Sequence, residues 1–302
     1  MQLIVTALWP VFALLLLGYL ARRSGFPGEG FWLPAERATY YVLFPALLVE
    51  RLAAASLAGE DSLRLALLVT AVLAVTALFC GLCKPLLRLA APAFTSFFQG
   101  SIRFNTYVAL AITAALHGSE GIVIAAVITA VMIPQLNLYS VLAFAFTSDR
   151  TFSLTRLLLA LLRNPLILAC LLGITLSLSG AGLPRPLASV LELLGRMALP
   201  LGLLAVGAGL NLRALRTAGR ALLTSSLIKL MLLPLLAFAL AGWVGLDSLT
   251  TSVLIIFMAV PTATSAYVLA RQMGGDADLM AAIITAQTLI SMLSLPVLLI
   301  LL

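Results

Sequence analysis

Residues 101–107 read SIRFNTY, and residues 259–267 read AVPTATSAY. Each run lies in the middle of an apolar stretch of about 20 residues, the length that spans a bilayer. Asn105 and Pro261 lie roughly ten residues into their stretches, which would place both near the bilayer centre. A proline removes a backbone donor, and an asparagine can bond the backbone groups that unwinding frees. Both stretches are therefore predicted to be helices that break near the membrane midplane.

The composition extends this prediction to the whole chain. Of 302 residues, 63% are hydrophobic and 10% are charged, and the mean hydropathy is +1.17. A soluble domain of this size carries far more charge on its surface. We predict an all-α integral membrane protein in which residues 1–302 form one transmembrane domain. Ten membrane helices are expected at about 3–22, 34–54, 63–91, 96–117, 120–146, 160–180, 186–211, 219–243, 250–273 and 277–301.

The basic residues predict how the chain is oriented. The net charge is +7, and the basic side chains lie in short loops, so membrane topology explains them better than nucleic-acid binding. The loops after odd-numbered helices hold eleven of them: Arg22, Arg23, Lys84, Arg88, Arg150, Arg156, Arg163, Arg213, Arg216, Arg220 and Arg271. The loops after even-numbered helices hold three: Arg51, Arg64 and Arg185. The odd loops should be cytoplasmic, with both termini outside the plasma (bacterial inner) membrane.

The two halves of the chain repeat. Matches at a shift of 155 residues pair Pro10, Gly18 and Pro45 with Pro165, Gly173 and Pro200. At a shift of 156 residues Gly118 pairs with Gly274, and Asn105 falls on Pro261. Residues 1–150 and 151–302 are thus predicted to be five-helix repeats. Because five is odd, the second copy enters from the opposite membrane face, which gives the inverted repeat of many secondary transporters.

Such repeats often place a binding site where corresponding helices break. Half-helix N-termini carry partial positive charge and free N–H groups, which suit a carboxylate. The alternative, which involves no binding site, is a proline kink in one helix and an asparagine that packs between helices. The sequence favours the crossed break, with these candidate substrate-binding residues: Asn105, Thr106, Tyr107, Pro261, Thr262, Thr264 and Ser265.

Other polar residues at membrane depth are candidates for helping that site. Arg103 and Lys229 could attract an anion, but Arg103 could instead cap a half-helix and Lys229 could reach an interface. Gln135, Asn137 and Gln287 could either line the site or brace unwound backbone. Helices 3, 4, 5, 8, 9 and 10 show no deep Asp or Glu, which leaves coupling to protons or sodium open.

Neither a metal site nor a catalytic site is predicted, and no cofactor is expected. Cys80 and Cys83 form a C-x-x-C inside an apolar helix, and Cys170 stands apart, so all three are expected to be buried hydrophobes. His117 lies at a helix end, and scattered serines offer it no nucleophile–base pair. Glu192 and Arg196, four residues apart on one helix, are expected to pair.

Several motifs together resemble the auxin efflux carrier family, which includes plant auxin carriers and bacterial dicarboxylate permeases. They occur in the family's order over nearly the whole chain: YVLFPALL at 41–48, RFNT at 103–106 ending in His117-Gly118, RNP at 163–165, LPLGLL at 199–204, and AVP at 259–261 with Ala270 and Asp276. The family commonly has Tyr where this chain has His117. The long hydrophilic loop of many plant members is absent between helices 5 and 6, which favours a bacterial-type member.

This resemblance implies a fold like that of sodium/proton antiporters and bile-acid symporters. Helices 1, 2, 6 and 7 would form a scaffold and a homodimer surface, and helices 3–5 and 8–10 a moving transport domain. It also implies alternating-access transport of a small organic anion such as malate, malonate or an auxin-like acid. The alternatives are a sodium-coupled bile-acid-type symporter, a channel and a membrane-embedded enzyme.

Overall fold

The computed structural model describes residues 2–54, 60–145, 147, 155, 159, 162–217 and 219–301. Throughout these ranges the regular structure is helical, and no strand occurs in them. The predicted all-α class is therefore confirmed. The repeat boundary at 150/151, the basic residues Arg150 and Arg156, and the predicted start of a helix at 160 lie outside the described residues.

The first half of the chain forms α1 (Gln2–Arg23), α2 (Glu29–Ala38), the π-helical turn η1 (Thr39–Leu43), α3 (Phe44–Ala53), α4 (Glu60–Leu87), α5 (Ala91–Ile102) and α6 (Thr106–Ala145). α6 is kinked at Gly118, where φ is 57° and ψ −142°. The second half forms α8 (Pro165–Leu178), α9 (Arg185–Ala208), the 3-10 turn η2 (Leu212–Thr217), α10 (Arg220–Leu227), the π-helical turn η3 (Ile228–Leu232), α11 (Leu233–Val244), α12 (Ser248–Ala259), α13 (Ser265–Met273) and α14 (Ala277–Leu301).

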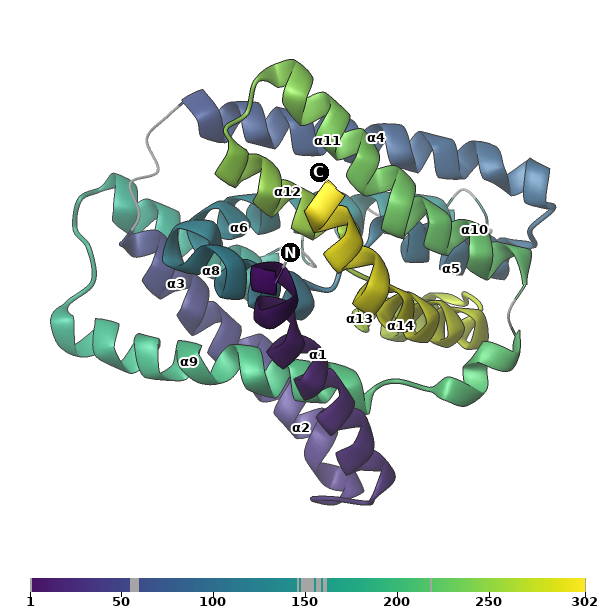
Figure 1. Ribbon diagram of the computed structural model, residues 1–302, viewed down its shortest axis with the longest axis horizontal. Coiled ribbons are helices and arrows are strands. Elements are labelled where there is room, and N and C mark those ends of the chain that lie inside the picture. The colour runs from purple at the N-terminus through teal and green to yellow at the C-terminus, as the bar shows by residue number, and fades with distance from the viewer. Residues whose placement is uncertain are drawn as a thin grey trace.

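The helices pack in two groups. In the first, α1, α2 and α3 pack on α9, and α8 packs on α3. In the second, α4, α5, α10, α11, α12 and α14 pack with one another, and α13 packs on α5 and α14. α6 contacts both groups. In Figure 1, α9 crosses the lower left, α1 and α2 extend below it, and α4 and α11 run along the top, so the groups occupy opposite sides of the molecule.

Close backbone contact holds the first group together. A Cβ atom added to Gly18 of α1 would lie 2.0 Å from the carbonyl oxygen of Leu204 on α9. A Cβ atom on Gly207 would lie 1.9 Å from the carbonyl oxygen of Leu15. Only glycine fits either position, because any other side chain would overlap backbone. The two helices therefore meet at a contact that small residues make possible, as is common in membranes.

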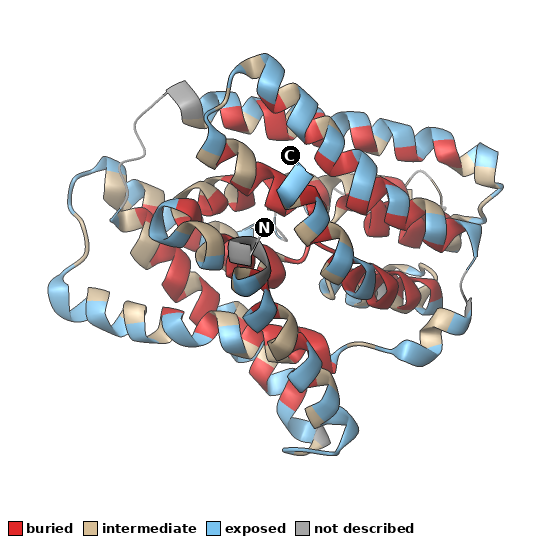
Figure 2. Cartoon of the chain, in the orientation of Figure 1, coloured by how far each residue is buried: buried red, intermediate tan, exposed pale blue. Residues whose placement is uncertain are grey.

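The outer faces of the bundle are apolar. Buried residues concentrate where the helices face one another, and exposed residues cover the outward faces of the bundle (Figure 2). On α4 the exposed side chains include Leu67, Leu78 and Leu82. Five stretches of the described residues are long and apolar enough to cross a membrane: Ser62–Leu87, Ala91–Ala145, Arg185–Ala208, Arg220–Val244 and Ala277–Leu301. An apolar exterior and several such stretches fit a multi-pass membrane protein.

Two wide helical turns precede prolines. In η1 the Phe44 N–H bonds to the Thr39 carbonyl, and in η3 the Leu233 N–H bonds to the Ile228 carbonyl, five residues back in each case. The next residues are Pro45 and Pro234, which have no N–H and crowd the preceding turn. A π-helical turn relieves that crowding without ending the helix. The chain thus continues from η1 into α3 and from η3 into α11.

Asp247 caps the N-terminus of α12, and its carboxylate accepts a hydrogen bond from the Thr250 amide at 2.9 Å. Burial raises the pKa of Asp247, but hydrogen bonds from Thr250 and nearby amides outweigh it and hold the pKa below its ordinary value. A lowered folded-state pKa stabilises the fold above the unfolded pKa, and this stability is lost as pH falls through the folded pKa. We expect Asp247→Ala to cost about 1 kcal/mol.

Thermal unfolding in detergent measures this cost, with Asp247→Asn as the matched control that keeps the cap oxygen. Equal unfolding temperatures for the alanine and asparagine variants at neutral pH would contradict the capping role.

Candidate functional site

Two short non-helical segments, each between two consecutive helices, lie next to each other. α5 ends at Ile102 and α6 begins at Thr106; α12 ends at Ala259 and α13 begins at Ser265. We call residues 103–105 and 260–264 together the crossover. The backbone N–H of Asn105 donates to the carbonyl oxygen of Pro261 at 2.8 Å, so the two interruptions touch. Two helix N-termini and two helix C-termini therefore meet at one place.

Asn105 caps the N-terminus of α6 from inside the protein. Its Oδ1 accepts hydrogen bonds from the amides of Tyr107 at 3.1 Å and Val108 at 3.2 Å. The residue is only 2% exposed, and its Nδ2 has no hydrogen-bond partner among the described residues. Burying an amide donor without a partner costs free energy of folding. A hydrogen-bond acceptor on a ligand would recover that free energy by pairing with it.

Gln287 of α14 braces the crossover. Its Oε1 accepts from the Thr262 amide at 2.9 Å, and its Nε2 donates to the Gly100 carbonyl at 3.0 Å and the Ser225 hydroxyl at 3.3 Å. The Thr262 hydroxyl in turn donates to the Gln99 carbonyl at 3.3 Å. Gln287 and Thr262 are both fully buried. Of the two roles predicted for Gln287, bracing unwound backbone is the one that these contacts support.

Lys229 of η3 points inward rather than toward an interface. The side chain is fully buried, and its Nζ donates to the carbonyl oxygens of Met258 at 3.0 Å and Phe257 at 3.4 Å. Within a continuous helix these carbonyls would accept from residues 261 and 262. Pro261 has no N–H, and the Thr262 N–H is bonded to Gln287. Lys229 therefore satisfies the C-terminal end of α12, whose partial negative charge favours a cation.

Arg103 also stands at the crossover, but it is held by side chains. Its guanidinium donates to Asn137 Oδ1 at 2.8 Å, Gln99 Oε1 at 3.3 Å and Ser140 Oγ at 3.5 Å. All three acceptors are neutral. Asn137, one of the predicted lining or bracing residues, thus positions Arg103. The positive charges of Arg103 and Lys229 have no ion-pair partner in the part of the chain that the structure describes.

The remaining candidate residues differ in accessibility. Tyr107 is buried and stacks on Phe44 of α3, with ring centroids 4.7 Å apart. Thr106 and Thr264 are half-buried, and Ser265, at the start of α13, is exposed. Thr264 precedes α13 without using its hydroxyl as a cap. The crossover therefore has a buried side around Asn105 and Pro261, and a more accessible side around Thr264 and Ser265.

Comparison with known proteins gives the family. Residues 147–299, about half of the chain, match the family model described as "Membrane transport protein". An uncharacterized transporter from Methanothermobacter thermautotrophicus is 30% identical over an alignment of 305 positions, which covers 95% of this chain and 94% of that protein. This chain belongs to the auxin efflux carrier family of membrane transport proteins. The resemblance drawn from the motifs is confirmed, and the family is one of membrane transport proteins.

One predicted residue of this transporter lies elsewhere. Gln135 donates from Nε2 to the Thr70 hydroxyl of α4 at 2.9 Å, and its Oε1 lacks a hydrogen bond among the described residues. It therefore links α6 to α4 of the second group of helices. No contact described for it reaches the crossover.

Sequence reasoning missed two residues at the crossover of this family member. Gln99 of α5 is fully buried and bonds Arg103 through Oε1, while its Nε2 has no partner among the described residues. A lone glutamine in an apolar helix was the available signal. Glu36 of α2 interacts with the Thr264 hydroxyl. It lies near the start of a predicted helix, where a carboxylate usually contacts water, so no pattern in the sequence distinguished it from a surface residue.

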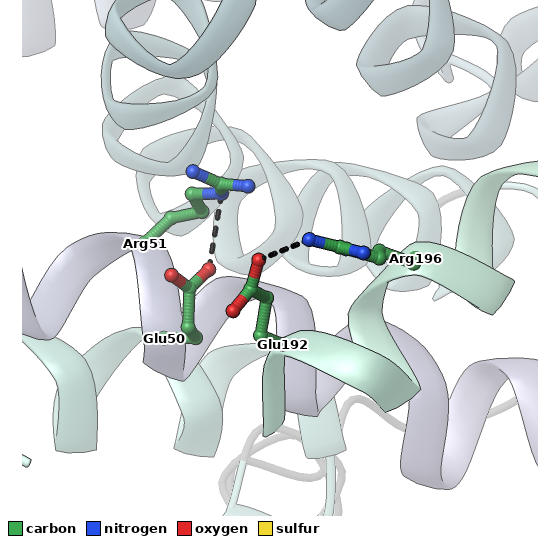
Figure 3. A network of polar contacts seen from close by, with 4 residues as sticks. All are labelled: Glu50, Arg51, Glu192 and Arg196. Carbon is green, nitrogen blue, oxygen red and sulfur yellow. Dashed lines mark hydrogen bonds and ion pairs between the residues drawn. The ribbon is translucent and has the colours of Figure 1, made fainter. Parts of the chain in front are cut away.

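A separate cavity of about 300 Å³ lies between α3, α6 and α9. Figure 3 shows its four charged residues. Glu192 and Arg196 form the predicted ion pair at 2.6 Å, and Glu50 Oε2 lies 3.0 Å from Arg51 Nε without hydrogen-bond geometry. Each arginine already has a carboxylate beside it. An anion would therefore be held less strongly in this cavity than at the crossover, where the partners of Arg103 and Lys229 among the described residues are all neutral.

Proposed function

We propose that this transporter moves a small organic anion by alternating access, and that a carboxylate group of the substrate binds at the crossover. The observation that carries the proposal is the Nδ2 of Asn105, a buried donor without a partner among the described residues. Its Oδ1 is fixed by two amides of α6, so the position of Nδ2 is fixed as well. A carboxylate oxygen is the acceptor that would satisfy it.

The electrostatics of the crossover support an anion over a cation. The N-termini of α6 and α13 each contribute about half a positive charge, and Arg103 and Lys229 add two full positive charges. Opposing them are the C-termini of α5 and α12 and the carboxylate of Glu36. With Lys229 protonated the balance is positive, which lowers the free energy of a bound anion in a low-dielectric interior.

The architecture that we propose has ten membrane helices in two inverted five-helix repeats, 1–150 and 151–302, with the plan of sodium/proton antiporters and bile-acid symporters. The interruptions at 103–105 and 260–264 support it, because they lie at positions that the 156-residue shift relates. The basic loops support termini on the outside of the plasma (bacterial inner) membrane. A homodimer through α1, α2, α3, α8 and α9 would leave the second group of helices free to move.

The two packing groups support alternating access. The crossover belongs to α5, α6, α12 and α13, whereas α1, α3, α8 and α9 pack mainly on one another. Rocking of one group against the other would expose the crossover first to one side of the membrane and then to the other. The buried Asn105 would then meet solvent only during transport.

A binding screen on purified protein tests this proposal. Mono- and dicarboxylates, including malonate, malate and indole-3-acetate, are added and the unfolding temperature is measured in detergent. We expect at least one carboxylate, and no matched amide, to raise the unfolding temperature in a saturable manner. A transporter that no carboxylate stabilises, or that carboxylates and their amides stabilise equally, would overturn the anion assignment.

A further inference from the structure

The cavity between α3, α6 and α9 carries charges of both signs. Figure 3 shows Glu50 and Arg51 of α3 beside Glu192 and Arg196 of α9. On α6 the lining includes Gly118, where the helix is kinked. Two carboxylates and two guanidinium groups balance each other, so neither a simple anion nor a simple cation is favoured. The cavity suits a ligand that carries one charge of each sign.

The charged pair on α3 leaves hydrogen-bonding capacity unused. Arg51 Nε and Glu50 Oε2 lie 3.0 Å apart without hydrogen-bond geometry, and neither buried atom has a hydrogen-bond partner among the described residues. The two residues are consecutive, and consecutive side chains of a helix do not face each other, which explains the poor geometry. A buried donor and a buried acceptor left unpaired cost free energy. A ligand that brings one acceptor and one donor would satisfy both.

The charged pair on α9 is in a different state. Arg196 donates to Glu192 at 2.6 Å, and these two side chains are 69% and 43% exposed. The cavity therefore has one accessible, satisfied pair and one more buried, unsatisfied pair. A primary ammonium has three donors, so it can bond Glu50 and also reach Glu192. A phosphate is the kind of acceptor that an arginine such as Arg51 binds best.

The surroundings of the cavity favour a membrane lipid as the source of such a ligand. α3 ends at Ala53, two residues beyond Arg51, so the cavity lies near a helix end. On α9, Leu193 and Met197 directly follow the two charged residues and are exposed. In a membrane protein the ends of the helices lie at the depth of the lipid headgroups, and exposed apolar side chains contact acyl chains.

We propose that this cavity binds a zwitterionic headgroup of the phosphoethanolamine class, with its phosphate on Arg51 and its ammonium between Glu50 and Glu192. The same chemistry occurs in an ethanolamine phospholipid and in the soluble diester glycerophosphoethanolamine. A cavity of about 300 Å³ is at the lower end of the range for ligand sites, which fits a headgroup. The bound headgroup contacts α3, α9 and α6 together. Because α6 contacts both groups of helices, the headgroup stabilises their packing. This inference does not depend on the substrate that binds at the crossover.

The test is the unfolding temperature of the purified protein in detergent, measured with two soluble diesters and two lipids. The diesters are glycerophosphoethanolamine and glycerophosphocholine, and the lipids are the corresponding dioleoyl phospholipids in mixed micelles. The two headgroups have the same net charge, but the choline ammonium carries methyl groups in place of N–H donors. We expect the ethanolamine lipid, and not the choline lipid, to raise the unfolding temperature in a saturable manner. The same rise with soluble glycerophosphoethanolamine would show that the headgroup alone is sufficient, and a rise with the lipid alone would show that the acyl chains contribute; both results support the site.

Variants locate the effect. Glu50→Gln and Arg51→Gln should each raise the half-saturating concentration of the ethanolamine compound by about tenfold or more, because each removes a charged partner. Glu120→Gln and Arg185→Gln are the matched controls, since both residues are exposed and neither lines the cavity. The controls should bind as the wild type does.

Three results would overturn the inference. They are no stabilisation of the wild type by either ethanolamine compound, equal stabilisation by the choline compounds, or equal half-saturation in the cavity variants and their controls. The comparison of ethanolamine with choline uses the wild type alone, so it decides the matter even where a cavity variant does not fold. Failure of carboxylates to bind at the crossover would leave this inference standing.

Discussion

Asn105→Asp is expected to abolish carboxylate binding while leaving the protein folded. The aspartate keeps an oxygen that can accept from Tyr107 and Val108, so the cap of α6 is retained. It replaces the unpartnered Nδ2 donor with a second oxygen and adds a negative charge. Loss of a hydrogen bond to a charged group alone costs about 1.5–3 kcal/mol, or roughly 10- to 150-fold in affinity, and charge repulsion adds to it. Carboxylate stabilisation against heat measures the loss.

Asn164→Asp is the matched control for this prediction. Asn164 caps α8 with the same geometry, since its Oδ1 accepts from the amides of Leu166 at 3.0 Å and Ile167 at 3.3 Å. It belongs to α8 in the first group, so the same change there should leave carboxylate binding intact. Should Asn105→Asp bind carboxylates as tightly as Asn164→Asp does, Asn105 would not contact the substrate.

Lys229→Met should cause the largest loss of stability among the polar substitutions considered. Methionine keeps the length of the side chain but removes the donor that the Phe257 and Met258 carbonyls share. No helical N–H can replace it, because residue 261 is a proline and the Thr262 N–H is bonded to Gln287. Leaving a buried polar group unpaired costs about 1–3 kcal/mol. The unfolding temperature should fall, and carboxylate affinity should fall with the lost positive charge.

Removal of a buried charge can also relieve a desolvation penalty, which would offset part of this loss. Here the unpaired carbonyls outweigh that relief, since they lie at the end of a helix whose dipole also loses its counter-charge. Lys84→Met is the matched control, because Lys84 is half-buried and lies 5.4 Å from the centroid of the Phe94 ring. Equal unfolding temperatures for the two methionine variants would show that Lys229 does not hold the end of α12.

Local chemistry explains what could be predicted from the sequence. Pro261 lacks a backbone N–H inside an apolar stretch, and Asn105 is a residue type that caps helices. The positions of both helix interruptions could therefore be predicted from the sequence. The all-α class follows from composition alone. The motifs identified the family, and the similar transporter confirms it.

What could not be predicted depends on which face of a helix meets which neighbour. Gln135 and Gln287 are the same residue type in apolar helices, yet one bonds α4 and the other braces the crossover. From the sequence Lys229 could either attract an anion or reach an interface, and its contact with the end of α12 depends on where α12 lies. Glu36 is decided by the approach of α2 to α13, which joins residues more than two hundred positions apart. Patterns within one sequence do not show which distant residues are in contact.

Malonate counterflow in proteoliposomes tests the central claim most directly. Vesicles loaded with unlabelled malonate and containing wild-type protein, Asn105→Asp or Asn164→Asp are placed in labelled malonate. If the crossover binds the substrate of an alternating-access carrier, the wild type and Asn164→Asp should accumulate label transiently and saturably, and Asn105→Asp should not. Equal counterflow by Asn105→Asp and the wild type would contradict a substrate site at the crossover, and flux without counterflow in the wild type would indicate a channel.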